Sequence, residues 1–119
     1  FRELVMRAIE DNFVNMGYSA GRSRDESRKL AAKYKNITTR AETLDALEDS
    51  YDYGDMVLAG LSDQNATEIV TGVRGVRTTR LGATLQAFED TMDHYGSLVV
   101  YLRLNGIESP DMAEEAEDK

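Results

Sequence analysis

One long helical pattern near the end of the chain constrains the fold most. Large apolar side chains recur there at steps of four and three residues, which predicts an amphipathic helix of about 25 residues. The predicted helix spans 79–105, Gly106 supplies its C-terminal cap, and Pro110 ends any continuation. We expect the apolar stripe to face the core. Its members are Leu81, Leu85, Phe88, Met92, Tyr95, Val99 and Leu102.

Two further long helices precede this one. Residues 1–16 repeat apolar side chains at helical spacing, and Gly17 is placed to end that helix. Thr39 and Glu42 have the spacing of a capping box, which predicts a helix from there to about residue 61. Between these helices we expect one short helix at 25–35, and after them a loop at 62–78 with a short extended piece at 68–73. The fold class predicted is all-α, an up-and-down antiparallel helix bundle.

Composition narrows the class of protein. The chain has 119 residues, which is typical of a single domain, and we place the bundle at 1–107 and an acidic, disordered tail at 108–119. A formal net charge of −8 argues against nucleic acid as a partner. The absence of cysteine excludes disulfides and thiolate ligands. No apolar run predicts a membrane span and no stretch resembles a signal peptide, so we expect a cytoplasmic protein without a membrane partner.

His94, the only histidine, carries the clearest chemical signal. Asp90 lies one helical turn before it, so both side chains point to one face, where they could share a metal ion or a hydrogen bond. Two ligands do not make a metal site, and a purely local contact between the two is the more common arrangement. Glu10 and Asp11 are further carboxylates on the first helix. No oxyanion hole accompanies Ser97, three residues from His94, so we reject a serine nucleophile there.

The segment 93–107 (DHYGSLVVYLRLNGI) resembles the last helix of the DinB superfamily, four-helix-bundle proteins that are also called YfiT-like metalloenzymes. Residues 78–82 resemble the segment that enters that helix, and 4–13 resembles the helix that carries the family's first metal ligand. The resemblance implies a DinB-like bundle that lacks its first helix in this chain. It also implies an open apolar groove, which a homo-oligomer or another partner would cover.

Members of that family typically bind a divalent metal through three histidines. Carried over by position, those ligands fall on Arg7, Asp90 and His94. Arginine has no lone pair to offer a metal ion, so the resemblance implies that this chain has lost the metal site and binds no cofactor. We expect an ion pair between Arg7 and Asp90 to occupy the place of the ion, with His94 beside it. One alternative stays open: zinc, nickel or manganese held by Asp90, His94 and either Glu10 or Asp11.

Three functions are compatible with these sequence features. The first is a small-ligand-binding or interaction domain that keeps the DinB-like fold without the metal. The second, which the resemblance implies, is a metal-dependent transferase of small thiols or a hydrolase. The third is an unrelated acidic helical protein that binds partners through its basic segment 22–35 and its acidic tail. The intact helical pattern beside altered ligand positions favours the first.

Overall fold

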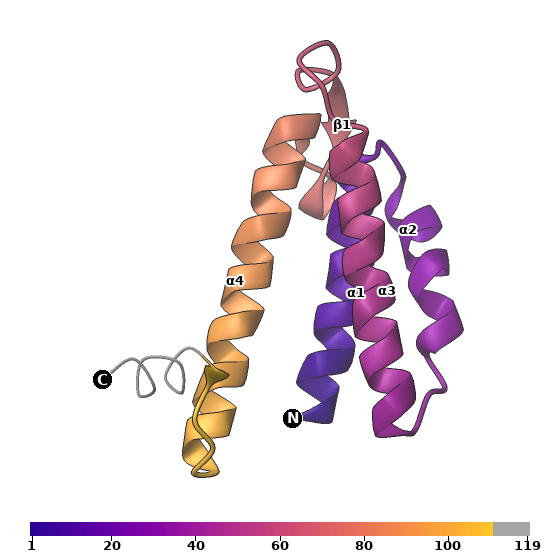
Figure 1. The fold of residues 1–119 in the computed structure, drawn as a ribbon. Helices are drawn as coiled ribbons and strands as arrows, with labels where there is room; N and C mark the ends of the chain where they lie inside the picture. Colours follow the sequence, from indigo (N-terminus) through magenta and orange to yellow (C-terminus); the bar gives the residue numbers. More distant parts are fainter. Residues whose placement is uncertain (111–119) are drawn as a thin grey trace.

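The computed structural model describes residues 1–110 and confirms an all-α architecture (Figure 1). Successive helices alternate in direction along the bundle. A small antiparallel hairpin, in which Ile69 pairs with Thr79, connects the last two helices. The helices are α1 (Arg2–Ser19), α2 (Arg24–Ala31), α3 (Arg40–Ala59) and α4 (Arg80–Leu104), with 3-10 turns at Ala32–Tyr34 and Val73–Gly75 and strands β1 (Ile69–Thr71) and β2 (Arg77–Thr79).

Side-chain caps fix where the helices begin. The predicted capping box is confirmed: the Thr39 hydroxyl accepts from the Glu42 N–H, and the Glu42 carboxylate accepts from the Thr39 N–H. Ser23 and Glu26 form a second capping box at α2, which the sequence reasoning missed. Thr79 caps α4, and Gly106, at a φ of 71°, follows its last turn as predicted.

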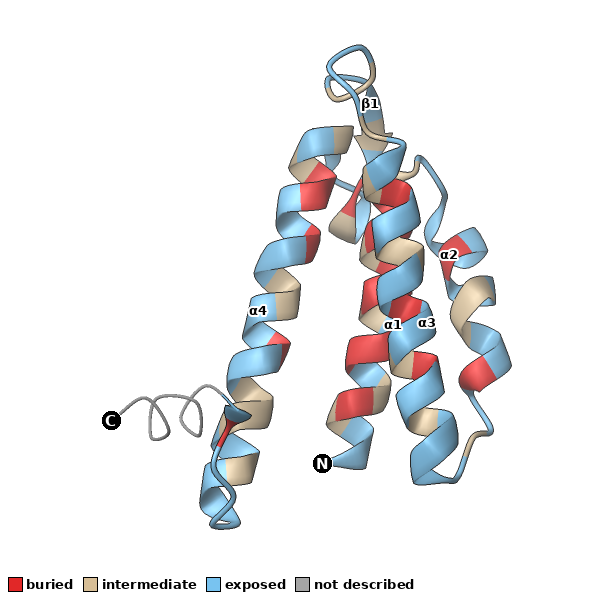
Figure 2. Ribbon diagram, viewed as in Figure 1, coloured by how far each residue is buried: buried red, intermediate tan, exposed pale blue. Residues whose placement is uncertain are grey.

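Helix α1 is the centre of the molecule, because α2, α3 and α4 all pack against it. Figure 2 shows buried residues concentrated along α1. Ile9 and Phe13 anchor the largest apolar cluster, where the Phe13 ring stacks on Tyr34 with 5.6 Å between centroids. Asn12 adds a polar link by donating to the Ser50 hydroxyl at 3.0 Å. The side chains of α1 therefore determine the positions of the other three helices.

The prediction that Gly17 ends the first helix is wrong. The helix continues to Ser19, and Gly17 is buried inside it against α2. A Cβ atom at Gly17 would lie 2.0 Å from the Ser27 Oγ and 2.7 Å from its Cβ. Glycine is therefore required here because the two helices approach too closely for any side chain, which no local helix signal reveals.

The prediction that the apolar stripe of α4 faces the core is also wrong. Its first five members are between 41% and 65% exposed. The buried residues of α4 are smaller or polar and lie about 100° around the helix from the stripe. Close packing on α1 selects this small-residue face and leaves the bulky one outward. The buried residues of α4 are Ala83, Thr84, Ala87 and His94.

The region predicted as a loop at 62–78 contains more structure than expected. The extended piece foreseen at 68–73 includes β1, but its partner β2 was missed. Of the predicted tail 108–119, residues 111–119 lie outside the described part of the chain. Ser109 is described, and it is buried. No helix within residues 1–110 is long and apolar enough to cross a membrane.

Substitution of Gly17 by alanine tests the close approach of α1 and α2. We expect Gly17→Ala to lower the free energy of unfolding by roughly 1–3 kcal/mol, because the added methyl overlaps Ser27. Gly54→Ala is the matched control, since its Cβ would meet only the Met16 side chain, at ordinary distances of 3.6 Å to Cγ and 4.0 Å to Cε. It should raise stability by up to about 1 kcal/mol. Urea unfolding of both variants measures this, and equal effects would refute the steric explanation.

The capping box of α3 should contribute to acid sensitivity. Hydrogen bonds from the Thr39 N–H, then from the Thr38 N–H and the Thr39 hydroxyl, hold the pKa of Glu42 below its ordinary 4.5. This contribution to stability is present above pH 4.5 and is lost as the pH falls through the lowered pKa. Glu42→Gln should flatten the loss of stability in that window, as measured by urea unfolding at several pH values. Glu48→Gln, an exposed change on the same helix, should leave the slope unchanged.

Candidate functional site

Three potential metal ligands from two helices meet on one side of the bundle. The His94 Nε2 lies 2.9 Å from the Asp11 Oδ2 and 3.4 Å from the Asp90 Oδ2. One ligand atom from each residue lies within 4.8 Å of the others. We call these three residues the Asp–Asp–His cluster. It brings together Asp90 and His94, both expected at the site, with Asp11, which was one of two alternatives for the third ligand.

The local structure explains this convergence. Asp90 and His94 are one turn apart on α4, so they project from the same face. The small side chains by which α4 packs on α1 bring that face close to Asp11. Asn15, one turn after Asp11 on α1, donates to the Asp90 Oδ2 at 2.9 Å. This hydrogen bond orients the Asp90 carboxylate, and Asn15 is a site residue that the sequence reasoning missed.

Arg7 does not lie where the predicted ion pair requires it. Its side chain is 75% exposed, and its Nε pairs with the Asp11 Oδ2 at 3.5 Å on the same helix. Within the described part of the chain, no ion pair joins Arg7 to Asp90. Glu10 also lies apart from the cluster, paired with Arg28 of α2 at 3.2 Å. The first helix therefore presents Asp11, and neither Arg7 nor Glu10, to the face of α4 that carries His94.

The spacing of the cluster fits a divalent ion. Ligands about 2.1 Å from a metal are roughly 3.0 Å apart at a right angle and roughly 3.4 Å apart in a tetrahedron. The two separations from the His94 Nε2, 2.9 and 3.4 Å, fall near these values. One imidazole and two carboxylates are donors suited to zinc, manganese, nickel or iron. The Asn15 hydrogen bond supplies the outer support that metal-binding carboxylates usually have.

Two of the three residues in the cluster are carboxylates, so the cluster favours a cation. Two carboxylates approach one ring nitrogen whose side chain is only 11% exposed. The guanidinium of Arg7 already places a positive charge 3.5 Å from the Asp11 Oδ2, and a metal ion bound at the ring nitrogen would place a second one between the carboxylates. The same three side chains can thus form either a hydrogen-bonded triad or a metal centre.

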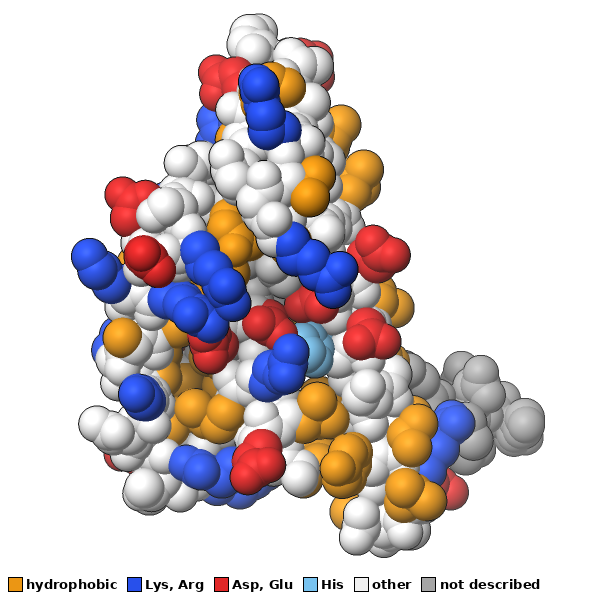
Figure 3. Space-filling model, turned by 180° about the vertical axis from the view of Figure 1, so that it is seen from behind, with side chains coloured by type: hydrophobic (Ala, Val, Ile, Leu, Met, Phe, Trp, Pro, Cys, Tyr) orange, Lys and Arg blue, Asp and Glu red, His pale blue; other side chains and the backbone are white. Residues whose placement is uncertain are grey.

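The surroundings of the cluster are basic although the chain is acidic overall. A cavity of about 770 Å³ lies along α1 and α2, and Arg7 and Asp11 form part of its wall. Five cationic side chains line it against three carboxylates. Figure 3 shows this face, with basic side chains around acidic ones and the histidine. The cationic residues are Arg2, Arg7, Arg24, Arg28 and Lys35, and the carboxylates are Glu3, Glu10 and Asp11.

Comparisons with protein-family models, with curated proteins and with solved structures find no match for this chain.

Proposed function

We propose that the chain binds one divalent metal ion through Asp11, Asp90 and His94 and serves as a metal-dependent hydrolase or transferase. The observation that carries this proposal is the approach of one imidazole nitrogen and two carboxylates at ligand spacing. Three protein ligands leave coordination positions for a substrate and a water molecule, the usual arrangement of catalytic metal sites. The bound ion would polarise a carbonyl or phosphoryl oxygen of the substrate or lower the pKa of a coordinated water.

The chain's own residues would position the reactants. Asn15 holds the Asp90 carboxylate in place through its 2.9 Å hydrogen bond. The exposed guanidinium of Arg7 partly neutralises Asp11 and can swing toward solvent when an ion arrives. The basic lining of the adjacent cavity would attract an anionic substrate toward the cluster. Anionic small molecules are therefore the substrate class that we propose.

The resemblance to the DinB superfamily supports the same proposal once the ligands are reassigned. The family position that falls on Arg7 would be served instead by Asp11, one turn later on the same face of α1. With Asp90 at the second position and His94 at the third, the ligand set would change from three histidines to one histidine and two aspartates. That change would favour harder metals than the family site does. Transfer to a small thiol is the activity that the resemblance implies.

The second candidate is a metal-free binding domain. It is favoured by the short separation between His94 and Asp11, 2.9 Å, which is an ordinary hydrogen-bond length, and by Arg7 at 3.5 Å from the same carboxylate oxygen. In this form, the hydrogen bond between the His94 Nε2 and the Asp11 carboxylate would hold α1 and α4 together. The adjacent cavity would then bind a small ligand without metal chemistry.

Metal titration separates the two candidates. We expect stoichiometric binding of Zn²⁺ or Mn²⁺ by isothermal titration calorimetry, with one ion per chain and an affinity that increases as the pH rises, because the ion displaces a proton. Asp11→Asn and His94→Gln should each weaken binding by at least about 100-fold, because each removes one of three ligands. Arg7→Gln should strengthen binding, since it removes a competing cation.

Glu10→Gln is the control for the loss of one negative charge, because Glu10 lies beside Asp11 but faces Arg28. It should leave metal affinity nearly unchanged. The metal-free candidate would be supported instead if protein purified without chelator carries no metal and its titration with Zn²⁺ or Mn²⁺ gives no saturable heat of binding.

We also propose that the exposed apolar stripe of α4 mediates self-association. Leu81, Leu85, Phe88 and Met92 form a continuous row on one side of the helix, and each is at least 45% exposed. A second copy of the chain could cover this row with its own, as two helices do across a twofold axis. Such pairing would remove from water an apolar surface that a monomer leaves exposed.

Light scattering after size-exclusion chromatography tests the self-association. The unmodified chain should have the mass of a dimer at micromolar concentration, and the Leu85→Glu, Met92→Glu double variant should be a monomer. Gln86→Glu, an exposed change beside Leu85, should remain a dimer. A monomer at every concentration of the unmodified chain would exclude the interaction.

A further inference from the structure

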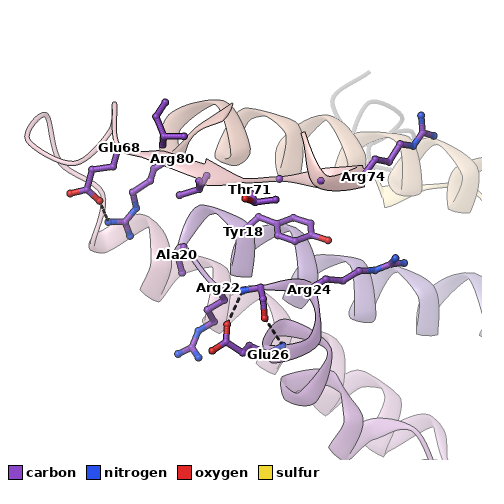
Figure 4. A pocket seen from close by; sticks show the side chains of 15 residues that line it. Tyr18, Ala20, Arg22, Arg24, Glu26, Glu68, Thr71, Arg74 and Arg80 are labelled. Atoms are coloured by element: carbon purple, nitrogen blue, oxygen red, sulfur yellow. Dashed lines mark hydrogen bonds and ion pairs between the residues drawn. The ribbon is translucent and has the colours of Figure 1, made fainter. Parts of the chain in front are cut away.

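A second cavity, of about 940 Å³, lies at the opposite end of α1 from its N-terminus. The last turn of α1 and the turn into α2 form one wall, and the β1–β2 hairpin forms the other (Figure 4). Its volume is in the range of small-molecule sites. Four arginines from three separate segments line it, and the lining includes Tyr18, Arg22, Arg24, Thr71, Arg74 and Arg80.

The cavity carries an excess of two positive charges, although the chain has a net charge of −8. Only two carboxylates line it, and both already have partners. Glu26 accepts from the Ser23 N–H at 2.8 Å, and Glu68 pairs with Arg80 at 3.4 Å. Within residues 1–110, neither Arg24 nor Arg74 forms an ion pair. Two guanidinium groups are thus left to bind an anion from outside the chain.

Arg74 adopts a backbone conformation that is costly for its residue type. It has a φ of 56° and a ψ of 23° at the tip of the hairpin, and it is the only non-glycine residue with positive φ among the described residues. Glycine or asparagine would occupy this left-handed region at a lower cost. The conformational cost of an arginine at this position motivates the search for a role of its side chain beyond forming the turn.

Tyr18 gives the cavity a small apolar edge beside the charges, since most of its ring packs against Val70 and Val73. In Figure 4, its ring lies between the hairpin and α2, and its hydroxyl points toward the end of the cavity where Arg24 and Arg74 extend. The ring is almost fully buried in the fold, so it is held rigidly. A ligand with an anionic group between the two arginines could place an uncharged ring or chain against the exposed edge of Tyr18.

We propose that this cavity binds a small phosphorylated molecule, with the phosphate between Arg24 and Arg74 and the uncharged part on Tyr18. A phosphate monoester carries close to two negative charges at neutral pH, which matches the excess of two positive charges in the lining. Arginine also matches phosphate geometry, because its planar fork donates two parallel hydrogen bonds. This site shares Arg24 with the cavity beside the Asp–Asp–His cluster but requires no metal.

Calorimetric titration with inorganic phosphate and with phenyl phosphate, at constant ionic strength and without divalent metal, tests the proposal. Both should bind saturably, and phenyl phosphate should bind more tightly because its ring reaches Tyr18. Arg74→Gly should weaken binding by roughly tenfold or more through loss of a charged hydrogen-bond donor. Glycine fits the backbone at position 74, so this variant keeps the fold. Arg24→Gln should have a similar effect.

Arg103→Gln is the matched control, since it removes one exposed positive charge from the far end of α4. It should bind phenyl phosphate as the unmodified chain does. An equal loss in Arg103→Gln and Arg74→Gly would show non-specific attraction and overturn the proposal, as would the absence of saturable binding. Benzoate that binds as tightly as phenyl phosphate would overturn the assignment to phosphate. Amide NMR shifts confined to the hairpin and the α1–α2 turn would support the location.

Discussion

The packing of three helices around α1 is the constraint on which the rest of the structure depends. One face of α1 holds the apolar cluster of Ile9 and Phe13 against α2 and α3. Another face of α1 meets α4, whose buried side chains over the first two turns of contact are no larger than threonine. Such close packing fixes the register between α1 and α4. That register places Asp11 opposite His94 and Asn15 opposite Asp90.

Much of the fold could be predicted from the sequence because its signals are local. The Thr39 capping box and Gly106 act within one turn of the helix ends that they define, so both predictions hold. The roles of Gly17 and of the α4 stripe depend instead on neighbours distant in the sequence. Periodicity shows that a helix has an apolar face, but not which face its partner covers. Here the partner α1 covers the small-residue face, and the bulky one remains exposed.

The candidate site could be predicted in part for the same reason. Asp90 and His94 lie one turn apart on one helix, and their spacing alone brings them together. The third residue comes from α1, and its identity depends on the helix register. Arg7 and Asp11 lie one turn apart on α1, so the register between α1 and α4 decides whether a cation or a carboxylate faces the histidine. The basic cavities could also be predicted only in part: the basic segment 22–35 supplies some of their cationic side chains, but the arginines that complete them come from segments that only the fold brings together.

The small side chains that α4 buries against α1 have a consequence for the dynamics of the chain. Because α4 buries mainly alanine, threonine and histidine side chains, it gains less apolar burial than α1 does. Its transient detachment would separate Asp11 from Asp90 and His94. Any cation bound among these three residues would oppose that opening, since it binds only the closed form. The exchange of α4 backbone amides with solvent would then slow in proportion to the occupancy of the site.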